Sequence, residues 1–523
     1  GCDTGTVRGL VFCISIEECN RLCTSFNENG LKSVALTGDS KEQERETAIQ
    51  RLESDGADKI DYIFTRDIFN EGVDIPRVNQ IILLRPTESA IVFVQQLGRG
   101  LRKTDGKEFL TVIDFIGNYR NNYLVPIALF GDTSYNKDRL RKLMVSGSSL
   151  IPGASTVNFD AIAKKRIYEA IDSANMKLKR DLDRDYELLK FKIGRTPTMV
   201  DFLEHGSRDP YLYVENAGSF YEYVSSKERK DLGVDKDGRE VLKGLSTKVA
   251  NGKRIEDVII LQALLEVQHI DKSDLFYTIK NRFGYTPSDE TFESCARSIN
   301  MEFVGKPCSI VEKTGDRLSR SSHLDQLLQN PTFTLYLKDL LSFAELAFEK
   351  KYQTSTYKNG FFLYEKYSRE DALRILNWST NPVAQNVGGY ITHPDKNCFV
   401  IFVTYHKSGN EQSSTDYEDR FLGTDRFEMI SKNNRSLNSP EIKLLANNRN
   451  IRIPFFLKKS NDEGKEFYYL GDVIPDFDAG AFEENLRGKN QDIKAVKVLF
   501  KLQQPVSDDL YEYFTDNSSL DIK

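Results

Sequence analysis

Short apolar segments that alternate with helical segments constrain the fold of the first 145 residues more than any other feature. Five segments have the length and the Val, Ile, Leu and Phe content of buried strands: RGLVFCIS, KSVALTG, DYIFTRD, NQIILLRP and EFLTVIDFIG. Helical patterns occur in IEECNRLCTSFNENG, KEQERETAIQRLESD and SAIVFVQQLGRGLRK, with Gly30 placed to end the first helix and Ser40 to cap the second. Repeated strand–helix–strand units predict a doubly wound, parallel α/β sheet.

Polar residues follow several of these strands. Thr37 and Gly38 follow the second strand, Thr65 opens the phrase TRDIFNEGVDIP, and Arg99 and Arg102 lie in QQLGRGLR. Ligands of such sheets bind beyond the carboxyl ends of the strands. Arginine is always charged, and its planar guanidinium matches phosphate oxygens. Glycine and threonine let backbone N–H and hydroxyl groups approach phosphates closely. The sequence therefore predicts a phosphate site at this edge.

The phrases LVFC, ALTG, TRDIFNEGVDIP and QQLGRGLR resemble, in order and spacing, motifs IV, IVa, V and VI of the second RecA-like domain of superfamily 2 helicases and translocases. The resemblance implies that Arg99 and Arg102 are the catalytic motif VI arginines, which reach the γ-phosphate of ATP. The ATP-binding positions that it implies are Gly72, Asp74, Gln95, Arg99 and Arg102. The positions that it implies for contacts with the DNA backbone are Thr37, Gly38 and Thr65.

The sequence lacks the other half of such a motor. It contains neither a G-x-x-x-x-G-K-[ST] loop to cradle phosphates nor a D-E-x-H-like box to hold magnesium. In the helicases that it resembles, both belong to the first RecA-like domain, so we expect this chain to be a C-terminal fragment that the first domain precedes. ATP and Mg²⁺ are the cofactors expected of the full-length protein. We expect the chain alone to hold neither tightly and to be inactive as an ATPase and as a nuclease.

Length and composition indicate a multidomain protein of a reducing compartment. A chain of 523 residues is too long for one core, and the linker SGSSLIPGAS marks a first boundary. Seven scattered cysteines show no zinc-ligand spacing, and Cys19 and Cys23 have the spacing of small core residues on a helix. No apolar run approaches a membrane span, and no signal peptide is recognisable. We expect a cytoplasmic, bacterial protein with no metal site in this chain and no membrane partner.

Residues 146–360 read as an α-helical linker or coupling domain. Within it, FKIGRTPTMVDFLEH resembles NRFGYTPSDETFESC, since both contain G-x-T-P-[ST]. We expect a helix to begin at each Thr-Pro, with proline in its first turn. The repeat is consistent with two small helical units whose helices are capped in the same way. It is also consistent with a pair of helix-turn-helix-like DNA contacts.

Residues 361–523 read as a β-rich domain. Alternating segments rich in aromatic residues, GGYITHP, CFVIFVTYH, IRIPFFLKK, EFYYLGDV and AVKVLFKLQ, predict a compact barrel or curved sheet. A pocket for a base taken out of the DNA stack needs an aromatic face and groups that match the Watson–Crick edge. Side chains of those types are Trp378, Tyr405, Asp416, Tyr417, Asn433 and Arg435. They also fit a polar surface loop over an aromatic core.

The whole arrangement, with a second RecA-like domain in 1–145, the linker in 146–360 and this tail, resembles the DUF3427 class of bacterial helicase-fused proteins. Within that class it resembles methylcytosine-dependent type IV restriction enzymes of the SauUSI type. The resemblance implies a tail with an SRA/PUA-like fold that binds double-stranded DNA containing 5-methylcytosine. It also implies a nuclease and a first RecA-like domain in cis, and a possible homodimer at full length.

Two other functions fit the same residues. One is a fragment of a DNA repair or RNA helicase whose tail recognises structure without recognising a modified base. The other is a non-catalytic nucleic-acid-binding scaffold that keeps the RecA-like fold without its chemistry.

Overall fold

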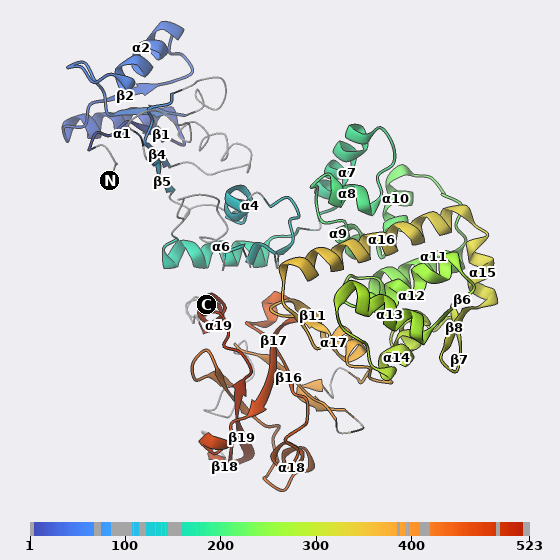
Figure 1. The fold of residues 1–523 in the computed structure, drawn as a ribbon. Coiled ribbons are helices and arrows are strands. Elements are labelled where there is room, and N and C mark those ends of the chain that lie inside the picture. The colour runs from blue at the N-terminus through green and yellow to red at the C-terminus, as the bar shows by residue number, and fades with distance from the viewer. Residues whose placement is uncertain are drawn as a thin grey trace. The chain divides into compact units, whose positions relative to one another are not determined.

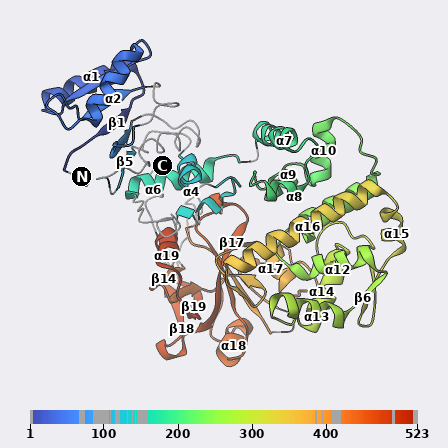
Figure 2. The same ribbon diagram turned by 45° about the horizontal axis from the view of Figure 1, so that its top comes forward.

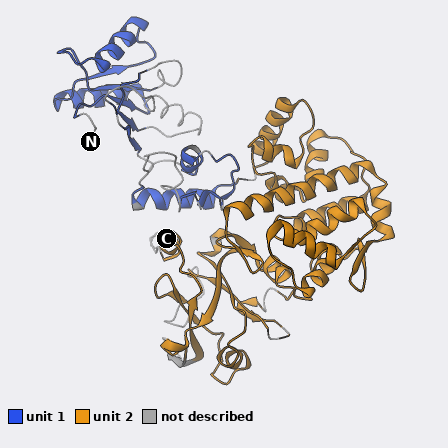
Figure 3. Cartoon of the chain, in the orientation of Figure 1, with its two compact units in different colours: residues 1–175 blue, residues 176–523 orange. Residues whose placement is uncertain are grey.

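The computed structural model forms two compact units, residues 1–175 and 176–523 (Figure 3). It describes residues 5–66, 75–84, 107, 109–114, 122–130, 132–137, 139–141, 143–144, 159–176, 178–383, 387–393, 395, 397–406, 419–487 and 492–515. Within these residues, the second unit contains both a helical part and a β-rich part, and the helix that follows the predicted SGSSLIPGAS boundary belongs to the first unit.

The first unit contains a parallel sheet, as the sequence predicts. Its five described strands have the order β2-β3-β1-β4-β5, and every pairing is parallel. The strands are β1 (Gly9–Phe12), β2 (Ser33–Leu36), β3 (Tyr62–Thr65), β4 (Gln80–Leu83) and β5 (Thr111–Asp114) (Figure 1). The helices are α1 (Ile16–Glu28), α2 (Glu42–Glu53), α4 (Leu124–Phe130) and α6 (Ala161–Ser173).

Helices cover the two faces of this sheet. Cys19 and Cys23 of α1 pack with Phe64 in one hydrophobic cluster, and Ala48 and Leu52 of α2 belong to a separate cluster that contains alternate residues of the same strands. Successive side chains of a strand point to opposite faces, so the two clusters lie on opposite sides of the sheet. The doubly wound arrangement and the core role of both cysteines are thereby confirmed.

The helix caps differ in one place from the sequence prediction. Ser15 caps α1 by accepting the N–H of Glu18, and Gly30 follows the helix with a φ of +81°. Ser40 does not cap α2, because the N-cap residue is Lys41. The Ser40 hydroxyl accepts the N–H of Thr37 and closes the preceding turn instead. A serine two residues before a helix can satisfy a loop as readily as a helix end.

The second unit begins with a helical part (Figure 1, Figure 2). The 24-residue helix α16 packs against α8 and α12, and a small antiparallel sheet of order β6-β8-β7 lies beside the helices. The helices are α7 (Lys179–Ile193), α8 (Met199–Glu204), α9 (Tyr211–Ala217), α10 (Phe220–Glu228), α11 (Lys236–Gly244), the π-helical turn η2 (Leu245–Val249), α12 (Ile255–Glu266), α13 (Lys272–Phe283), α14 (Asp289–Ile299), α15 (Ser322–Leu328) and α16 (Pro331–Thr354). The small strands are β6 (His269–Asp271), β7 (Val311–Thr314) and β8 (Arg317–Arg320).

The sequence repeat forms the same local structure twice. α7 and α13 each end at a left-handed glycine, Gly194 and Gly284, and a Thr-Pro step then leads into α8 and α14. The N-cap residue is Thr198 or Ser288, so each proline precedes the cap and is not in the first turn, contrary to our expectation. The hydroxyl residue after proline takes the cap position because its extended backbone suits an N-cap.

The β-rich part is one mixed sheet with the described order β12-β13-β16-β17-β19-β15-β14, to which β11 adds at β17 and β18 at β19. Its strands are β11 (Lys366–Ser368), β12 (Gly389–Thr392), β13 (Phe399–Thr404), β14 (Arg420–Phe421), β15 (Arg426–Ile430), β16 (Pro454–Lys458), β17 (Glu466–Pro475), β18 (Phe482–Arg487) and β19 (Asp492–Leu502). The ribbon β9 (Tyr357–Lys358)–β10 (Phe361–Phe362) precedes it, and its helices are α17 (Arg369–Ile375), α18 (Pro440–Asn447) and α19 (Asp508–Thr515). β13 and β16 pair in parallel, so the sheet is mixed and is not a simple antiparallel meander.

A buried ionic cluster joins the helical part to the β-rich part. Arg254 donates from Nε and Nη2 to the two carboxylate oxygens of Asp257, at 2.8 and 2.7 Å. Arg374 of α17 donates to the same carboxylate. Arg254 also donates to the hydroxyls of Ser294 and Ser298 on α14, at 2.9 and 2.7 Å. Because these groups are almost wholly buried, the two parts cannot separate without exposing them.

Acid should weaken this contact between the two parts, because it also includes Asp371 of α17. The Asp371 carboxylate accepts hydrogen bonds from Asn251 and Lys253 of the helical part, at 2.8 and 3.2 Å. Burial alone would raise the pKa of Asp371, but the charges of Lys253 and Arg374 outweigh burial and hold that pKa well below its usual value. Such a carboxylate stabilises the fold above its unfolded-state pKa of about 4, and this stability is lost as the pH falls through the folded-state pKa. We expect the free energy of unfolding, measured by urea titration, to fall more steeply below about pH 4 in the wild type than in Asp371→Asn. Identical pH dependence in the two proteins would contradict this assignment.

Candidate nucleotide and nucleic-acid site

The sheet register brings polar residues of the first unit to one edge. Thr65 ends β3 opposite both Phe12 of β1 and Leu36 of β2, and Asp114 ends β5 opposite Leu83 of β4. Because all five described strands are parallel, their carboxyl ends meet at this edge. The turn that begins at Thr37 therefore lies next to Thr65.

Internal hydrogen bonds fix the turn after β2. The Thr37 N–H donates to the Ser40 hydroxyl at 2.9 Å, and the Ser40 N–H donates to the Thr37 carbonyl at 3.0 Å. Arg45 of α2 donates to the Gly38 carbonyl at 3.0 Å. Gly38 is exposed, and a Cβ built there would meet no atom within 4 Å. The turn thus presents an open, preformed stretch of backbone that a nucleic-acid strand could approach.

Thr65 and Asp114 are less accessible. Thr65 is 0% exposed, and its hydroxyl has no hydrogen-bond partner among the residues that the structure describes. The Asp114 carboxylate oxygens also lack a partner in that part of the chain, and burial raises the pKa of Asp114 to about 6. Sequence reasoning missed Asp114, although an acid that ends the buried segment TVID could have indicated it. In this structure the buried Thr65 side chain has no exposed surface that a nucleic-acid strand could contact.

Seven predicted site residues lie outside the described residues: Gly72, Asp74, Gln95, Arg99, Arg102, Asp416 and Tyr417. Their assignments remain predictions.

Trp378 occupies a different place from the one predicted for it. The indole is 4% exposed and belongs to the core cluster of the β-rich part, where it packs edge-to-face against His393 at 5.1 Å. A base pocket needs an aromatic face that is free to stack. In this structure Trp378 is a core residue and offers no such face.

The other described pocket residues fall into two separate sets of contacts. Tyr405, after β13, packs against His406 and Phe421, with ring centroids 4.9 and 5.7 Å away. Arg435 forms an ion pair with Glu441, while Asn433 is exposed two residues earlier. The structure therefore does not gather the predicted residues that it describes around one hollow.

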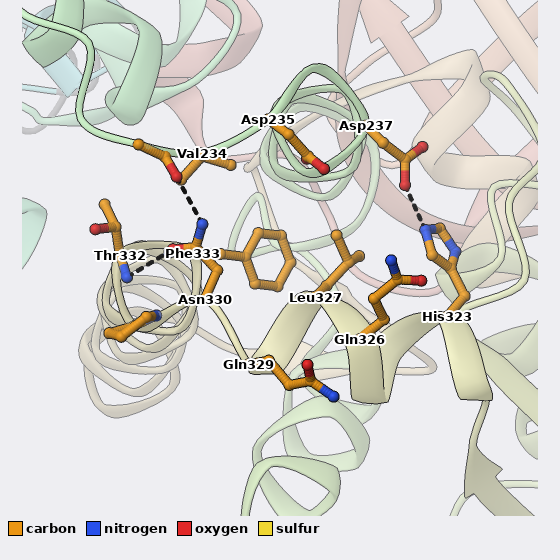
Figure 4. A pocket seen from close by; sticks show the side chains of 12 residues that line it. Val234, Asp235, Asp237, His323, Gln326, Leu327, Gln329, Asn330, Thr332 and Phe333 are labelled. Atoms are coloured by element: carbon orange, nitrogen blue, oxygen red, sulfur yellow. Dashed lines mark hydrogen bonds and ion pairs between the residues drawn. The ribbon is translucent and has the colours of Figure 1, made fainter.

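A hollow of about 570 Å³ lies in the helical part, beside α15 and at the N-terminal ends of α11 and α16 (Figure 4). His323 Nε2 lies 2.6 Å from an Asp237 carboxylate oxygen, and the Asn330 amide donates to the Gly233 carbonyl at 2.6 Å. Asn330 also caps α16 through its amide oxygen. These side chains have structural partners, so the hollow alone indicates no ligand.

No group of three or more His, Cys, Asp or Glu side chains in the part of the chain that the structure describes is placed to hold a metal ion. None of the described helices is long and apolar enough to cross a bilayer.

Comparison with protein families assigns three segments. Residues 4–104 match "Helicase conserved C-terminal domain". The chain carries a superfamily 2 helicase C-terminal domain. Residues 182–354 match "Domain of unknown function (DUF8090)", and residues 361–514 match "Domain of unknown function (DUF3427)". The chain is thus helicase-related, and the DUF3427 domain expected from its arrangement is present.

The helicase domain also has relatives in other organisms. "Putative ATP-dependent helicase IRC3" of Saccharomyces cerevisiae is 34% identical over 108 residues, covering 21% of this chain and 15% of that protein. "Putative mitochondrial ATP-dependent helicase irc3" of Schizosaccharomyces pombe is 35% identical over 111 residues, covering 21% and 18%. The chain thus spans less than a fifth of either relative. The solved C-terminal domain of the DEAD-box protein Dbp5 is 21% identical and covers 20% of this chain and 59% of that domain, with a TM-score of 0.18.

Proposed function

We propose that this chain is the C-terminal portion of an ATP-dependent, 5-methylcytosine-directed type IV restriction endonuclease. It contributes the second half of the DNA translocase motor and the reader of methylated DNA. The observation that supports this most is the presence, on one chain, of a helicase C-terminal domain at 4–104 and a DUF3427 domain at 361–514. A nuclease and a first RecA-like domain complete the enzyme in cis.

In the motor, ATP and Mg²⁺ bind between the two RecA-like domains. Gly72, Asp74, Gln95, Arg99 and Arg102 would line this chain's side of the site. Arginines beside a γ-phosphate stabilise the charge that develops during phosphoryl transfer. The open turn at Thr37 and Gly38 would follow the DNA backbone, since backbone N–H groups position nucleic acid without reading its sequence. Thr65, which pairs in register with Leu36, would lie beside that turn.

In the reader, the base-contacting groups would come from the loops of the β-rich part. Tyr405, Asp416, Tyr417, Asn433 and Arg435 remain the proposed residues, whereas Trp378 belongs to the core of the β-rich part. Arg435 is held by Glu441 and by the Lys494 carbonyl, which accepts its backbone N–H at 3.1 Å. This loop is therefore fixed before DNA arrives.

Binding to methylated and unmethylated duplexes of one sequence tests the reader. We expect the whole 523-residue chain to bind the methylated duplex about 5- to 150-fold more tightly, because recognition of one base pair is worth about 1–3 kcal/mol. Fluorescence anisotropy at fixed salt measures both dissociation constants. The whole chain is needed because Asp257 and Arg374 tie the β-rich part to the helical part. Equal affinities would instead support a repair or RNA helicase, or a scaffold.

A further inference from the structure

Two cationic side chains lie over one aromatic ring in the β-rich part. The Arg369 guanidinium carbon, at the start of α17, lies 5.1 Å from the centre of the Phe467 ring. Nζ of Lys458, the last residue of β16, lies 4.9 Å from the same centre. Phe467 belongs to β17, which pairs with β16 (Figure 1). The two positive charges are therefore within about 10 Å of each other, inside one Debye length at 0.1 M salt.

No carboxylate neutralises Arg369 among the residues that the structure describes. Its Nε is buried and has no hydrogen-bond partner there, and its guanidinium lies over Phe467 and, at 5.8 Å, over Phe402. Burial lowers the pKa of Arg369 from its usual value. The side chain is thus a partly desolvated charge held against two rings.

Lys458 adds a second charge to the same place. Its Nζ donates to the Gly464 carbonyl at 2.9 Å, and an ammonium carries two further N–H groups, for which the described residues show no hydrogen bond. Burial lowers the pKa of Lys458 first, and the positive charge of Arg369 lowers it further, although the carboxylate of Glu463 acts in the opposite direction. That carboxylate is 1% exposed, lies 3.7 Å from Lys366, and accepts the backbone N–H of Lys459.

These features fit a site that is completed by an anion. An aromatic face attracts a cation but provides no acceptor for a buried N–H. An oxyanion would supply that acceptor and would screen the repulsion between the two charges. Phosphate suits the pair best because the planar guanidinium donates two parallel bonds while the ammonium acts as a point charge. Thr404 lies opposite Lys458 in the parallel pairing of β13 and β16, which places a hydroxyl on the same face.

We propose that Arg369 and Lys458 form a phosphate-binding site that holds a phosphodiester group of bound DNA. This proposal rests on the proposed function only in assuming that the β-rich part contacts DNA. The site would position the duplex relative to the reader loops without contributing sequence information, as phosphate contacts do.

The test measures binding of the whole chain to a fluorescein-labelled duplex over a range of salt concentrations. Arg369→Met keeps an apolar stem over Phe467 and removes the charge. We expect its dissociation constant to rise about tenfold at 0.1 M salt and the slope of log K against log salt to fall by about 1. Arg449→Met is the matched control, because Arg449 is an exposed arginine over another ring, that of Phe477 at 4.4 Å. Arg449→Met should leave both quantities within twofold of the wild type.

Two further measurements make the outcome decisive. Methylated and unmethylated duplexes should lose affinity equally in Arg369→Met, so a wild-type affinity ratio of one would contradict the proposed reader and leave the phosphate site standing. Titration calorimetry with inorganic phosphate identifies the source of the ligand. Phosphate binding that Arg369→Met abolishes, together with unchanged DNA affinity, would assign the site to free phosphate and overturn the DNA contact. Unchanged affinity for both ligands, with unchanged Trp378 fluorescence, would overturn the site itself.

Discussion

Replacing Asp257 with alanine should destabilise the second unit by about 3–5 kcal/mol. The carboxylate is 0% exposed and lies between the guanidinium groups of Arg254 and Arg374, which are 2% and 1% exposed. Without Asp257, two buried cations would lie near each other, and the side-chain acceptors left to Arg374 among the described residues would be the more distant Asp371 and Asn251, at 3.4 and 3.5 Å. Breaking a buried ion pair costs more than the pair contributes, because the remaining charge cannot regain its hydration.

Trp378 makes this loss measurable. It is the only tryptophan of the chain and lies in the core of the β-rich part, so its fluorescence reports unfolding of the second unit alone. Urea titration of Asp257→Ala should therefore show a lower midpoint with a similar slope. Asp289→Asn is the matched control, since Asp289 is 75% exposed and pairs with Lys272 at 3.1 Å. That variant should lose less than about 1 kcal/mol.

A second variant separates charge from packing. In the double variant Asp257→Ala with Arg374→Met, the buried positive charge of Arg374 is removed together with its partner. We expect the double variant to be less destabilised than the sum of the two single variants, because neighbouring charges couple strongly. Additive losses would show that the ionic cluster does not join the two parts in the way that its hydrogen bonds indicate.

Replacing Arg99 with alanine should lower DNA-stimulated ATP hydrolysis by about 10³- to 10⁵-fold in a full-length polypeptide that supplies the first RecA-like domain. An arginine at a γ-phosphate stabilises the charge that develops in the transition state, so its loss affects turnover far more than DNA binding. Steady-state ATPase assays and anisotropy with the same duplex measure the two effects separately. Arg99→Lys should recover only part of the rate, because an ammonium lacks the planar fork of donors.

The control for this experiment comes from the same unit. Arg51 lies on α2 and donates to the Asp58 carbonyl at 2.9 Å. Arg51→Ala should therefore leave turnover unchanged within about twofold, since surface substitutions remote from a site have small effects. If Arg99→Ala also left turnover unchanged, the RecA-like domain would be a scaffold and the motor proposal would fail.

The amino-acid pattern alone was enough to predict the parallel sheet of the first unit. The apolar runs around Leu10 and around Ile63 are short and continuous, which is the pattern of strands buried on both faces. Because segments with helical periodicity separate such runs, the pattern predicts a parallel sheet with helices between its strands. The sequence also supported the helicase assignment, because several motifs in a fixed order are far more specific than any single motif. Helix ends were predictable where the cap is local, as at Ser15 and Gly30, and were missed at Ser40, where the hydroxyl bonds to the loop.

Which side chains contact one another depends on how the elements pack in three dimensions. Asp257 and Arg374 are separated by 117 residues, and Arg369 meets Lys458 through the ring of Phe467, which no local pattern predicts. For the same reason the sequence could not distinguish a base pocket from the core at Trp378, because the residue types that suit a base pocket also fill an aromatic core. Periodicity reports which face of an element is apolar, whereas the packing of several elements determines whether a polar or aromatic group is buried, paired or left free for a ligand.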